Sequence, residues 1–238
     1  MYWSDYINDY LAFNYVFSIP ISKANFKDKI LFVDAAFLKA GAEQKLFVYP
    51  DAERSVSYLR RREEQFFSEK RQWISFLDFE QFADTSSGQF QIFLPDANGQ
   101  LTPIPYRQPF INLKIFQIDN TSELHWLDVA QEDDWGREVL FSIRSNSTIW
   151  LENIGLSYGE NSHVTILDPP VDNRFFAYRI VPRFNSFLRD ITAAVESLGG
   201  EITLDEYGGT QVTEQGILLD GRLIFQEDID AGKIELPI

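Results

Sequence analysis

Aromatic side chains are the property of this chain that most constrains its fold. The sequence contains 21 Phe, 10 Tyr and 5 Trp residues, whereas its single Met is the first residue. Each buried aromatic ring removes roughly 150–250 Å² from water, and such rings pack with defined geometry where Met would adapt. We therefore predict a rigid core built from aromatic rings. For a minority of them, display on an interaction surface is the alternative, because interfaces are enriched in aromatic anchors.

Length and polarity place the chain among globular proteins. Of its 238 residues, 45% are hydrophobic and 24% are charged, and the mean hydropathy is −0.21. Chains of this size form one large or two small domains. Because we find no internal repeat, low-complexity tract or flexible linker, the simplest organisation is a main α+β domain over residues 1–198. Residues 199–238 are predicted to form a β-rich C-terminal extension packed on that domain.

Net charge excludes whole classes of ligand. The 36 acidic residues outnumber the 21 basic ones, which leaves a formal charge of −15. Nucleic-acid affinity comes largely from clustered Lys and Arg, and anionic membranes repel an acidic surface. We therefore expect neither a nucleic acid nor a membrane as a partner.

The excess acid is concentrated in two segments. Residues 120–172 and residues 196–238 each hold ten acidic and two basic residues, while residues 173–195 between them are weakly basic. A solvated face that keeps the protein in solution is one interpretation. The other is a surface that steers a basic protein partner toward this chain.

The absence of cysteine excludes a further set of sites. Disulfides, iron–sulfur clusters, zinc sites built on thiolates and cysteine nucleophiles all require a thiol. The amino terminus shows neither the cationic region nor the small-residue cleavage site of a secretion signal. The longest uncharged run, between Asp9 and Lys23, is too short to span a bilayer. We therefore expect a cytoplasmic protein without a cofactor.

Runs rich in β-branched and aromatic residues predict strands along most of the chain. The predicted strands are 10–19, 30–33, 45–49, 111–118, 138–143, 148–151, 163–167 and 174–181. Beyond residue 199, shorter strands joined by glycine turns are predicted at 201–205, 211–213, 217–219 and 222–225. The sequence thus favours a sheet-rich fold.

A hairpin is predicted around the Asn98-Gly99 pair. Residues 89–94 alternate between apolar and polar side chains, residues 101–106 follow the turn, and Asn-Gly is a turn sequence that hairpins favour. Proline occurs repeatedly from Pro103 onward, at Pro103, Pro105 and Pro109. Since proline cannot donate to a strand ladder, the second arm is predicted to be an edge strand or a loop.

Two helices are predicted. Pro50 and Asp51 provide a stop and an N-cap, after which residues 52–82 carry apolar side chains at helical spacing. The second helix is predicted over residues 184–198, and it ends where Gly199 can adopt the left-handed conformation. Together with the strands, these helices predict an α+β fold with a mainly antiparallel sheet.

Gly155 to Gly159 match the G-x-S-x-G pattern of a hydrolase nucleophile elbow. That motif needs a helix directly after the serine, and an acid and a histidine farther along the chain. Here strand-like residues follow, and the one downstream histidine, His163, comes six residues after Ser157. We therefore interpret the segment as a glycine-bounded turn.

Candidate metal ligands are few. The two histidines, His125 and His163, stand apart from any metal-binding motif. Carboxylates that could hold a hard cation follow the first histidine, at Asp128, Glu132, Asp133 and Asp134. Their segment lacks the glycine and the spacing of a calcium loop, so a solvated turn is favoured.

Part of the sequence resembles the closing half of the SMI1/KNR4 superfamily. The strand 138–143, the turn 144–147 and the segment around Trp150 are followed by Val181-Pro-Arg-Phe184-Asn-Ser-Phe187-Leu188. In that family a strand pair, often with tryptophan in its second strand, precedes a helix that begins with a Ser-Phe-x-x-Phe-Leu signature. The resemblance implies a bacterial immunity or scaffold protein that neutralises a toxin by binding it, and an acidic surface suits a basic nuclease partner.

These observations favour a non-enzymatic, acidic protein-interaction module that binds a basic protein partner. The predicted partner-binding residues are Asp128, Glu132, Asp133, Asp134, Trp135, Asp205, Glu206 and Tyr207. One alternative is a hydrolase that works through Asp and Glu, with or without a divalent ion. Several carboxylates converging in a pocket with raised pKa values would favour that alternative. A structural subunit of a larger assembly is the other alternative.

Overall fold

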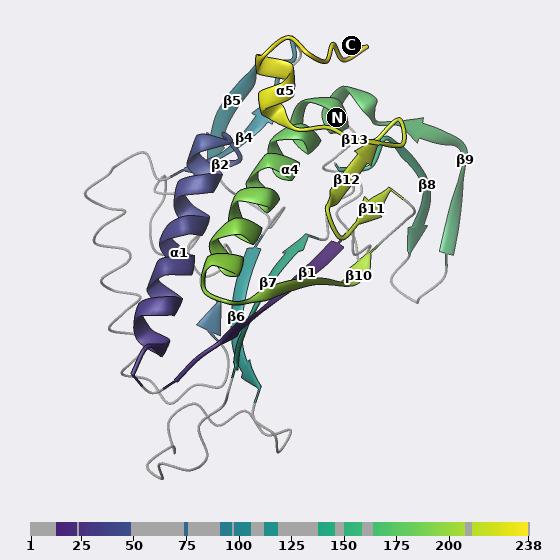
Figure 1. Cartoon of the computed structure of the whole chain (residues 1–238). Coiled ribbons are helices and arrows are strands. Elements are labelled where there is room, and N and C mark those ends of the chain that lie inside the picture. The colour runs from purple at the N-terminus through teal and green to yellow at the C-terminus, as the bar shows by residue number, and fades with distance from the viewer. Residues whose placement is uncertain are drawn as a thin grey trace.

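The structure is a computed structural model that describes residues 13–22, 24–48, 74–75, 91–96, 98–105, 112–118, 138–145, 150–158, 164–207 and 211–237. Its long helices, α1 (Phe26–Glu43) and α4 (Arg174–Ser197), lie side by side over one face of an antiparallel sheet (Figure 1). Helices and antiparallel sheets thus occur together. The α+β fold class predicted from the sequence is confirmed.

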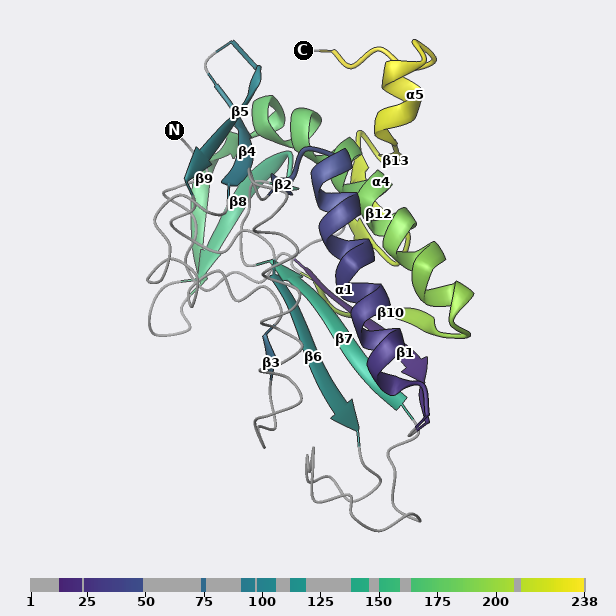
Figure 2. The same cartoon turned by 90° about the vertical axis from the view of Figure 1, so that its left-hand side faces the viewer.

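The main sheet joins distant parts of the chain. Strand β1 (Phe13–Pro20) pairs antiparallel with β7 (Glu138–Ser145) on one side and with β10 (Glu201–Tyr207) on the other. Beyond β7 follow β6 (Asn112–Ile118) and β3 (Ile74–Ser75), and the order is β10-β1-β7-β6-β3. Figure 2 shows α1 crossing in front of this sheet. The C-terminal part of the chain therefore supplies one edge strand of the main sheet.

The core lies between the sheet and the helices, and it is built from aromatic rings. Phe13, Tyr15 and Phe17 are completely buried, because alternate residues of β1 face the helices. Phe184 of α4 packs on them, with its ring centroid 4.6 Å from that of Phe13. Trp150 closes the cluster, with its ring centroid 5.0 Å from that of Phe184. The aromatic core predicted from composition is confirmed.

The hairpin predicted around Asn98 and Gly99 is confirmed. Strands β4 (Gln91–Pro95) and β5 (Leu101–Pro105) pair antiparallel, and β2 (Phe47–Val48) joins β4 on its other side. Gly99 in the turn has a φ of +79°. β5 is an edge strand of this sheet, as its prolines predict.

Residues 30–33, predicted to form a strand, lie within α1. The prediction depended on a short apolar run, and such a run does not distinguish a strand from a buried helix. The buried side chains Val33, Phe37 and Ala40 show the helical spacing of one face. Packing of that face beside α4 decides the conformation.

The second helix is longer than predicted. Residues 174–181, predicted to form a strand, are the first turns of α4, so the helix begins well before the predicted boundary. Phe176, Ile180 and Phe184 are buried at intervals of four residues, and this apolar face continues past Pro182. Proline lacks an N–H for the helix ladder and usually marks a boundary. Here burial of the whole face outweighs that local cost.

The helix predicted over residues 52–82 lies outside the described residues, except at β3. There Ile74 pairs with Ile115 of β6, so the helix prediction is wrong for this short strand. Pairing with a neighbouring strand overrides local helical spacing. The strand predicted at 148–151 is described only in part, and Trp150 lies in a helical turn there.

The serine motif lies in a strand. β8 (Asn153–Tyr158) pairs with β9 (Val164–Asp172), and Ser157 stands opposite Thr165. The turn predicted around this serine is therefore wrong for residues 155–158. A nucleophile elbow also needs a sharp turn at its serine, whereas the backbone of β8 is extended there.

A small sheet follows β10 and packs on α4. Its strands are β11 (Val212–Thr213), β12 (Gly216–Leu219) and β13 (Arg222–Leu223), and α5 (Gln226–Asp230) comes next. The short strands predicted beyond residue 199 are confirmed, whereas α5 was not predicted. Asp220 and Gly221 connect β12 to β13 with φ values of 47° and 70°. An Asp-Gly pair suits this two-residue hairpin turn.

Candidate functional site

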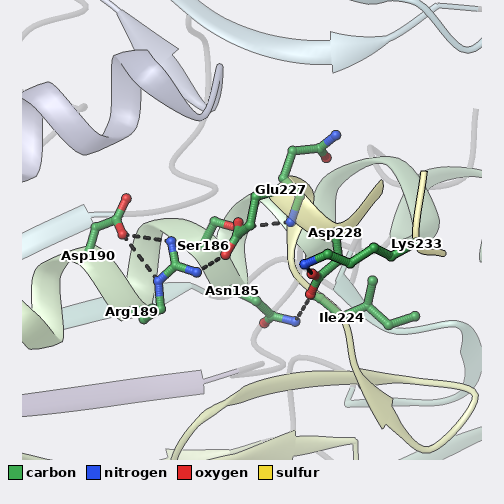
Figure 3. A network of polar contacts seen from close by, with 9 residues as sticks. Asn185, Ser186, Arg189, Asp190, Ile224, Glu227, Asp228 and Lys233 are labelled. Carbon is green, nitrogen blue, oxygen red and sulfur yellow. Dashed lines mark hydrogen bonds and ion pairs between the residues drawn. The ribbon is translucent and has the colours of Figure 1, made fainter. Parts of the chain in front are cut away.

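Two buried polar residues of α4, Asn185 and Ser186, hold the small sheet in place. Asn185 Nδ2 donates hydrogen bonds to the carbonyl oxygens of Ile217 (2.9 Å) and Ile224 (2.8 Å). Its Oδ1 accepts one from the N–H of Ile217 (2.8 Å). Figure 3 shows the bond to Ile224. A single side chain thus satisfies three backbone groups that would otherwise be buried without partners.

Ser186 extends this contact to α5. Its Oγ donates to Glu227 Oε2 (2.6 Å) and accepts a hydrogen bond from the N–H of Gln226 (2.9 Å). Glu227 also contacts Arg189, one turn along α4 (Figure 3). We refer to four of these residues as the polar clamp: Asn185, Ser186, Arg189 and Glu227.

Arg189 is neutralised within the fold. Besides its contact with Glu227, its guanidinium lies 2.9 Å from a carboxylate oxygen of Asp190. The same guanidinium lies 5.2 Å from the ring centre of Phe225, within range of a cation–π contact. With two carboxylates beside it, Arg189 does not act as a free positive charge.

A pocket of about 350 Å³ lies beside the polar clamp. Its apolar wall consists of Leu188, Ile202, Leu223 and Phe225. These residues come from the C-terminal half of α4, from β10 and from the small sheet with the segment after it. We refer to this pocket as the groove.

Carboxylates dominate the charge of the groove. Glu196 and Glu214 line it and are exposed. Within the described part of the chain, neither makes an ion pair. Arg189 is the cation among the described lining residues, and counting it with these two acids and its partners Asp190 and Glu227 leaves three negative charges in excess. The groove therefore combines an apolar wall with an acidic rim.

The end of α4 positions one side of the groove. Leu188, Thr192 and Glu196 are spaced by four residues, so they follow one another along a single helix face. Gly199 then adopts a φ of +78° and donates its N–H to the carbonyl of Glu196 (2.9 Å). This left-handed residue ends the helix and returns the chain as β10. The turn thereby places Ile202 opposite the helix face.

The residues predicted from the sequence to bind a partner are only partly described. Five of them lie outside the described residues: Asp128, Glu132, Asp133, Asp134 and Trp135. Asp205, Glu206 and Tyr207 are consecutive in β10, and Asp205 is not among the described residues that line the groove. Asp205 is exposed and accepts a hydrogen bond from Asn14 Nδ2 (3.0 Å). The structure thus brings this trio to the strand that borders the groove through Ile202.

A second group of polar residues lies at the other end of α4. Glu152 is buried, and its Oε1 accepts a hydrogen bond from the N–H of Asp220 (2.5 Å). Tyr178 donates its hydroxyl to Asp220 Oδ2 (2.6 Å). Burial raises the pKa of Glu152, and burial together with the bond to Asp220 raises the pKa of Tyr178. These bonds tie the β12–β13 turn to the helix.

A neighbouring carboxylate in that region has the opposite electrostatic environment. Arg174 lies 2.6 Å from Asp172, and both side chains are exposed. This hydrogen-bonded pairing lowers the pKa of Asp172 to about 2. The pKa values of Glu152 and Asp172 thus move in opposite directions, because Glu152 is buried whereas Asp172 is paired with Arg174.

The groove offers groups for binding. Its hydroxyl side chain, Thr192, donates to the carbonyl of Leu188 in its own helix (2.8 Å). No group of three His, Cys, Asp or Glu residues that could hold a metal ion occurs among the residues that the structure describes. Apolar contact and negative charge, together with the exposed amide of Gln215, are therefore what the groove presents to a ligand.

Sequence reasoning did not find the groove. Glu196 and Glu214 were counted in the acidic segment 196–238, but nothing in the sequence distinguished them from its other acids. Their apolar neighbours Leu188 and Phe225 come from separate elements. The spacing of Leu188 and Glu196 along one helix face was the available signal.

Comparison with known proteins finds no relative. No family model, curated protein or solved structure matches the chain. Of the helices in the described ranges, none is long and apolar enough to cross a membrane. The groove is therefore interpreted from its own geometry.

Proposed function

We propose that this protein is an acidic interaction module that binds a partner rich in Lys and Arg through the groove. The observation that carries the proposal is an apolar wall beside two exposed carboxylates, Glu196 and Glu214, which make no ion pair within the described residues. An apolar anchor surrounded by a polar rim is the usual anatomy of a protein interface. An apolar side chain of the partner would enter the groove while its cations meet the rim.

The two parts of the groove contribute differently to binding. Burying one apolar side chain contributes about 1.5–3 kcal/mol. Each exposed ion pair at the rim adds about 0.2–1 kcal/mol and is screened by salt. The formal charge of −15 acts mainly on the rate at which a basic partner arrives. We therefore expect affinity from the anchor, and salt dependence from the rim.

The resemblance to the SMI1/KNR4 superfamily suggests the most specific form of this proposal. In that form the protein is a bacterial immunity protein that neutralises a basic toxin in the cytoplasm by covering part of its surface. Phe184, Phe187 and Leu188, which carry the resemblance, are buried core residues of α4. In this proposal Phe184 and Phe187 support the fold, whereas Leu188 also lines the groove that would contact the toxin.

Binding of a basic peptide tests the proposal. The probe is a fluorescent peptide of seven residues that alternates Lys and Val, and its control has Glu in place of each Lys. By fluorescence anisotropy, we expect saturable binding of the Lys peptide that weakens about tenfold between about 50 mM and about 500 mM salt. Equal binding of both peptides, or binding of neither, contradicts the proposal.

Charge reversal at the rim locates the interaction. A variant with Glu196→Lys and Glu214→Lys is expected to bind the Lys peptide about 10-fold to 100-fold more weakly. The matched control carries Asp28→Lys and Glu43→Lys on exposed positions of α1, so its net charge is the same. Its affinity should fall by about twofold at most, because only long-range attraction changes. Equal losses in the two variants contradict binding at the groove.

A further inference from the structure

β10 is an edge strand. It pairs with β1 on one side, and no strand in the described part of the chain pairs with its other side (Figure 1). Alternate residues of an edge strand direct their N–H and C=O groups away from the sheet. Over its seven residues, β10 therefore presents backbone groups that another extended chain can bind.

The side chains of β10 select which chain can bind. Ile202 and Leu204 pack against the core, whereas Glu201 and Asp205 are exposed. The strand contains no Pro, Gly or Lys, which are residues that discourage pairing at an edge. Its exposed acids repel a second copy of the same strand and attract a basic one.

The groove borders this strand. Ile202 belongs to β10 and also lines the groove, opposite Leu188 of α4. Side chains of a strand alternate between its two faces, so every second residue of an added strand would face the helices as Ile202 does. An apolar side chain at such a position lies beside the groove, and its neighbours along the strand face the other side of the sheet, where Glu201 is exposed.

We propose that the partner binds through an extended basic segment that adds to the free edge of β10. One apolar side chain of this segment occupies the groove, and a Lys or Arg side chain next to it in the segment meets Glu201 on the other face of the sheet. Long cationic side chains at the ends of the paired stretch reach Glu196 and Glu214 at the rim. Backbone hydrogen bonds provide affinity in this mode, while the groove provides specificity. The inference rests on the proposed function and specifies the form of the partner as an extended segment.

Backbone methylation of the probe tests strand addition. One derivative of the Lys–Val peptide carries methyl groups on the backbone nitrogens of its Val residues, and a second carries them on those of its inner Lys residues. Each derivative blocks one edge of the peptide strand, because alternate residues direct their N–H groups to opposite edges. The control carries its methyl groups on the Lys side-chain nitrogens, where charge and backbone donors are retained.

We expect at least one backbone-methylated derivative to bind about tenfold or more weakly than the parent peptide, and the side-chain control to stay within about twofold. If the parent binds and neither derivative loses affinity, strand addition is overturned and the proposed function stands. If the parent does not bind, the proposed function itself fails. The protein is the same in every arm, so no outcome depends on whether a variant folds.

Two further measurements identify what occupies the edge. Hydrogen exchange should slow at backbone amides of β10 when the Lys–Val peptide binds, and unchanged exchange there overturns strand addition. Light scattering without peptide should give a monomer. A dimer that the peptide does not dissociate would show that a second copy occupies the edge, which also overturns the inference.

Discussion

The two ends of α4 hold carboxylates of the same kind in different surroundings. At the N-terminal end, the buried carboxylate of Glu152 accepts a hydrogen bond from the N–H of Asp220, and the exposed carboxylate of Asp220 accepts one from the Tyr178 hydroxyl. At the C-terminal end, Glu196 and Glu214 are exposed and make no ion pair with any described residue. A buried carboxylate needs protein partners, whereas an exposed one is free to meet another molecule. The difference teaches that the role of an acidic residue follows from its position in the fold more than from the net charge of −15.

The polar clamp lies between these two ends of α4 and holds the helix against the small sheet. Asn185 reaches β12 at Ile217 and the segment after β13 at Ile224, so it supports the wall of the groove and the turn that holds Asp220. A substitution there should therefore disturb both ends at once. Substitutions at either end should affect stability or binding separately.

The largest effect is expected for Asn185→Ala. It leaves three buried backbone groups without partners, and the free energy of unfolding should fall by about 3–5 kcal/mol. Urea denaturation measures this loss, and folded protein should also bind the Lys–Val peptide more weakly. Gln100→Ala is the control, because Gln100 is exposed, and it should cost less than about 0.5 kcal/mol. Similar losses in both variants would contradict the role of the clamp.

A smaller effect separates the two ends directly. Tyr178→Phe removes the hydrogen bond to Asp220 and should lower the free energy of unfolding by about 0.5–1.5 kcal/mol, with no change in peptide affinity. Glu214→Gln should do the reverse: stability stays within about 0.5 kcal/mol, and affinity for the Lys–Val peptide falls by about twofold to fivefold. Denaturation and anisotropy on both variants measure this. If Glu214→Gln destabilises the protein more than Tyr178→Phe does, the distinction between the ends is wrong.

The smallest effect concerns pH. Burial raises the pKa of Glu152, so proton binding to this carboxyl favours the folded state. The free energy of unfolding should gain a contribution as the pH falls through the raised pKa, complete below the ordinary value of 4.5. Glu152→Gln has no carboxyl at this position to bind a proton. The stability of this variant should therefore rise less than that of the wild type as the pH falls from about 7 to about 5.

Urea denaturation at the two pH values compares the wild type with Glu152→Gln. Glu214→Gln is the control, and it should keep the pH response of the wild type because Glu152 is intact in it. The pKa of Asp172 is about 2, below this range of pH. Equal pH responses in the wild type and Glu152→Gln would contradict the claim that burial raises the pKa of Glu152 in the folded protein.

Much of the sheet could be predicted because its patterns are local. Phe13, Tyr15 and Phe17 alternate with less hydrophobic residues, and that period indicates a strand with one buried face. The Asn98-Gly99 pair indicates a turn by its local sequence alone, and so do the glycines between the C-terminal strands. The helices were harder to predict from the sequence. The apolar run at 30–33 suggests a strand and Pro182 suggests a helix boundary, and only the packing of the folded chain shows that both lie within helices.

The groove could not be predicted, because its walls meet only in the folded chain. Leu188, Ile202 and Phe225 come from a helix, a strand and the segment after β13. Sequence reasoning selected acids by local density, and this led to Asp205 and its neighbours in β10. It could not show that Glu152 is buried and partnered while Glu196 is exposed and makes no ion pair with a described residue, since only tertiary contacts separate the two.

A nuclear magnetic resonance titration tests the central claim most directly. Amide shifts of the ¹⁵N-labelled protein are followed while the unlabelled Lys–Val peptide is added. We predict that the shifts concentrate at Thr192, Ile202 and Glu214, around the groove, and that the amides of Glu152 and Asp220 stay in place. Shifts centred on Glu152 and Asp220, or spread evenly over the acidic surface, would contradict the assignment of binding to the groove.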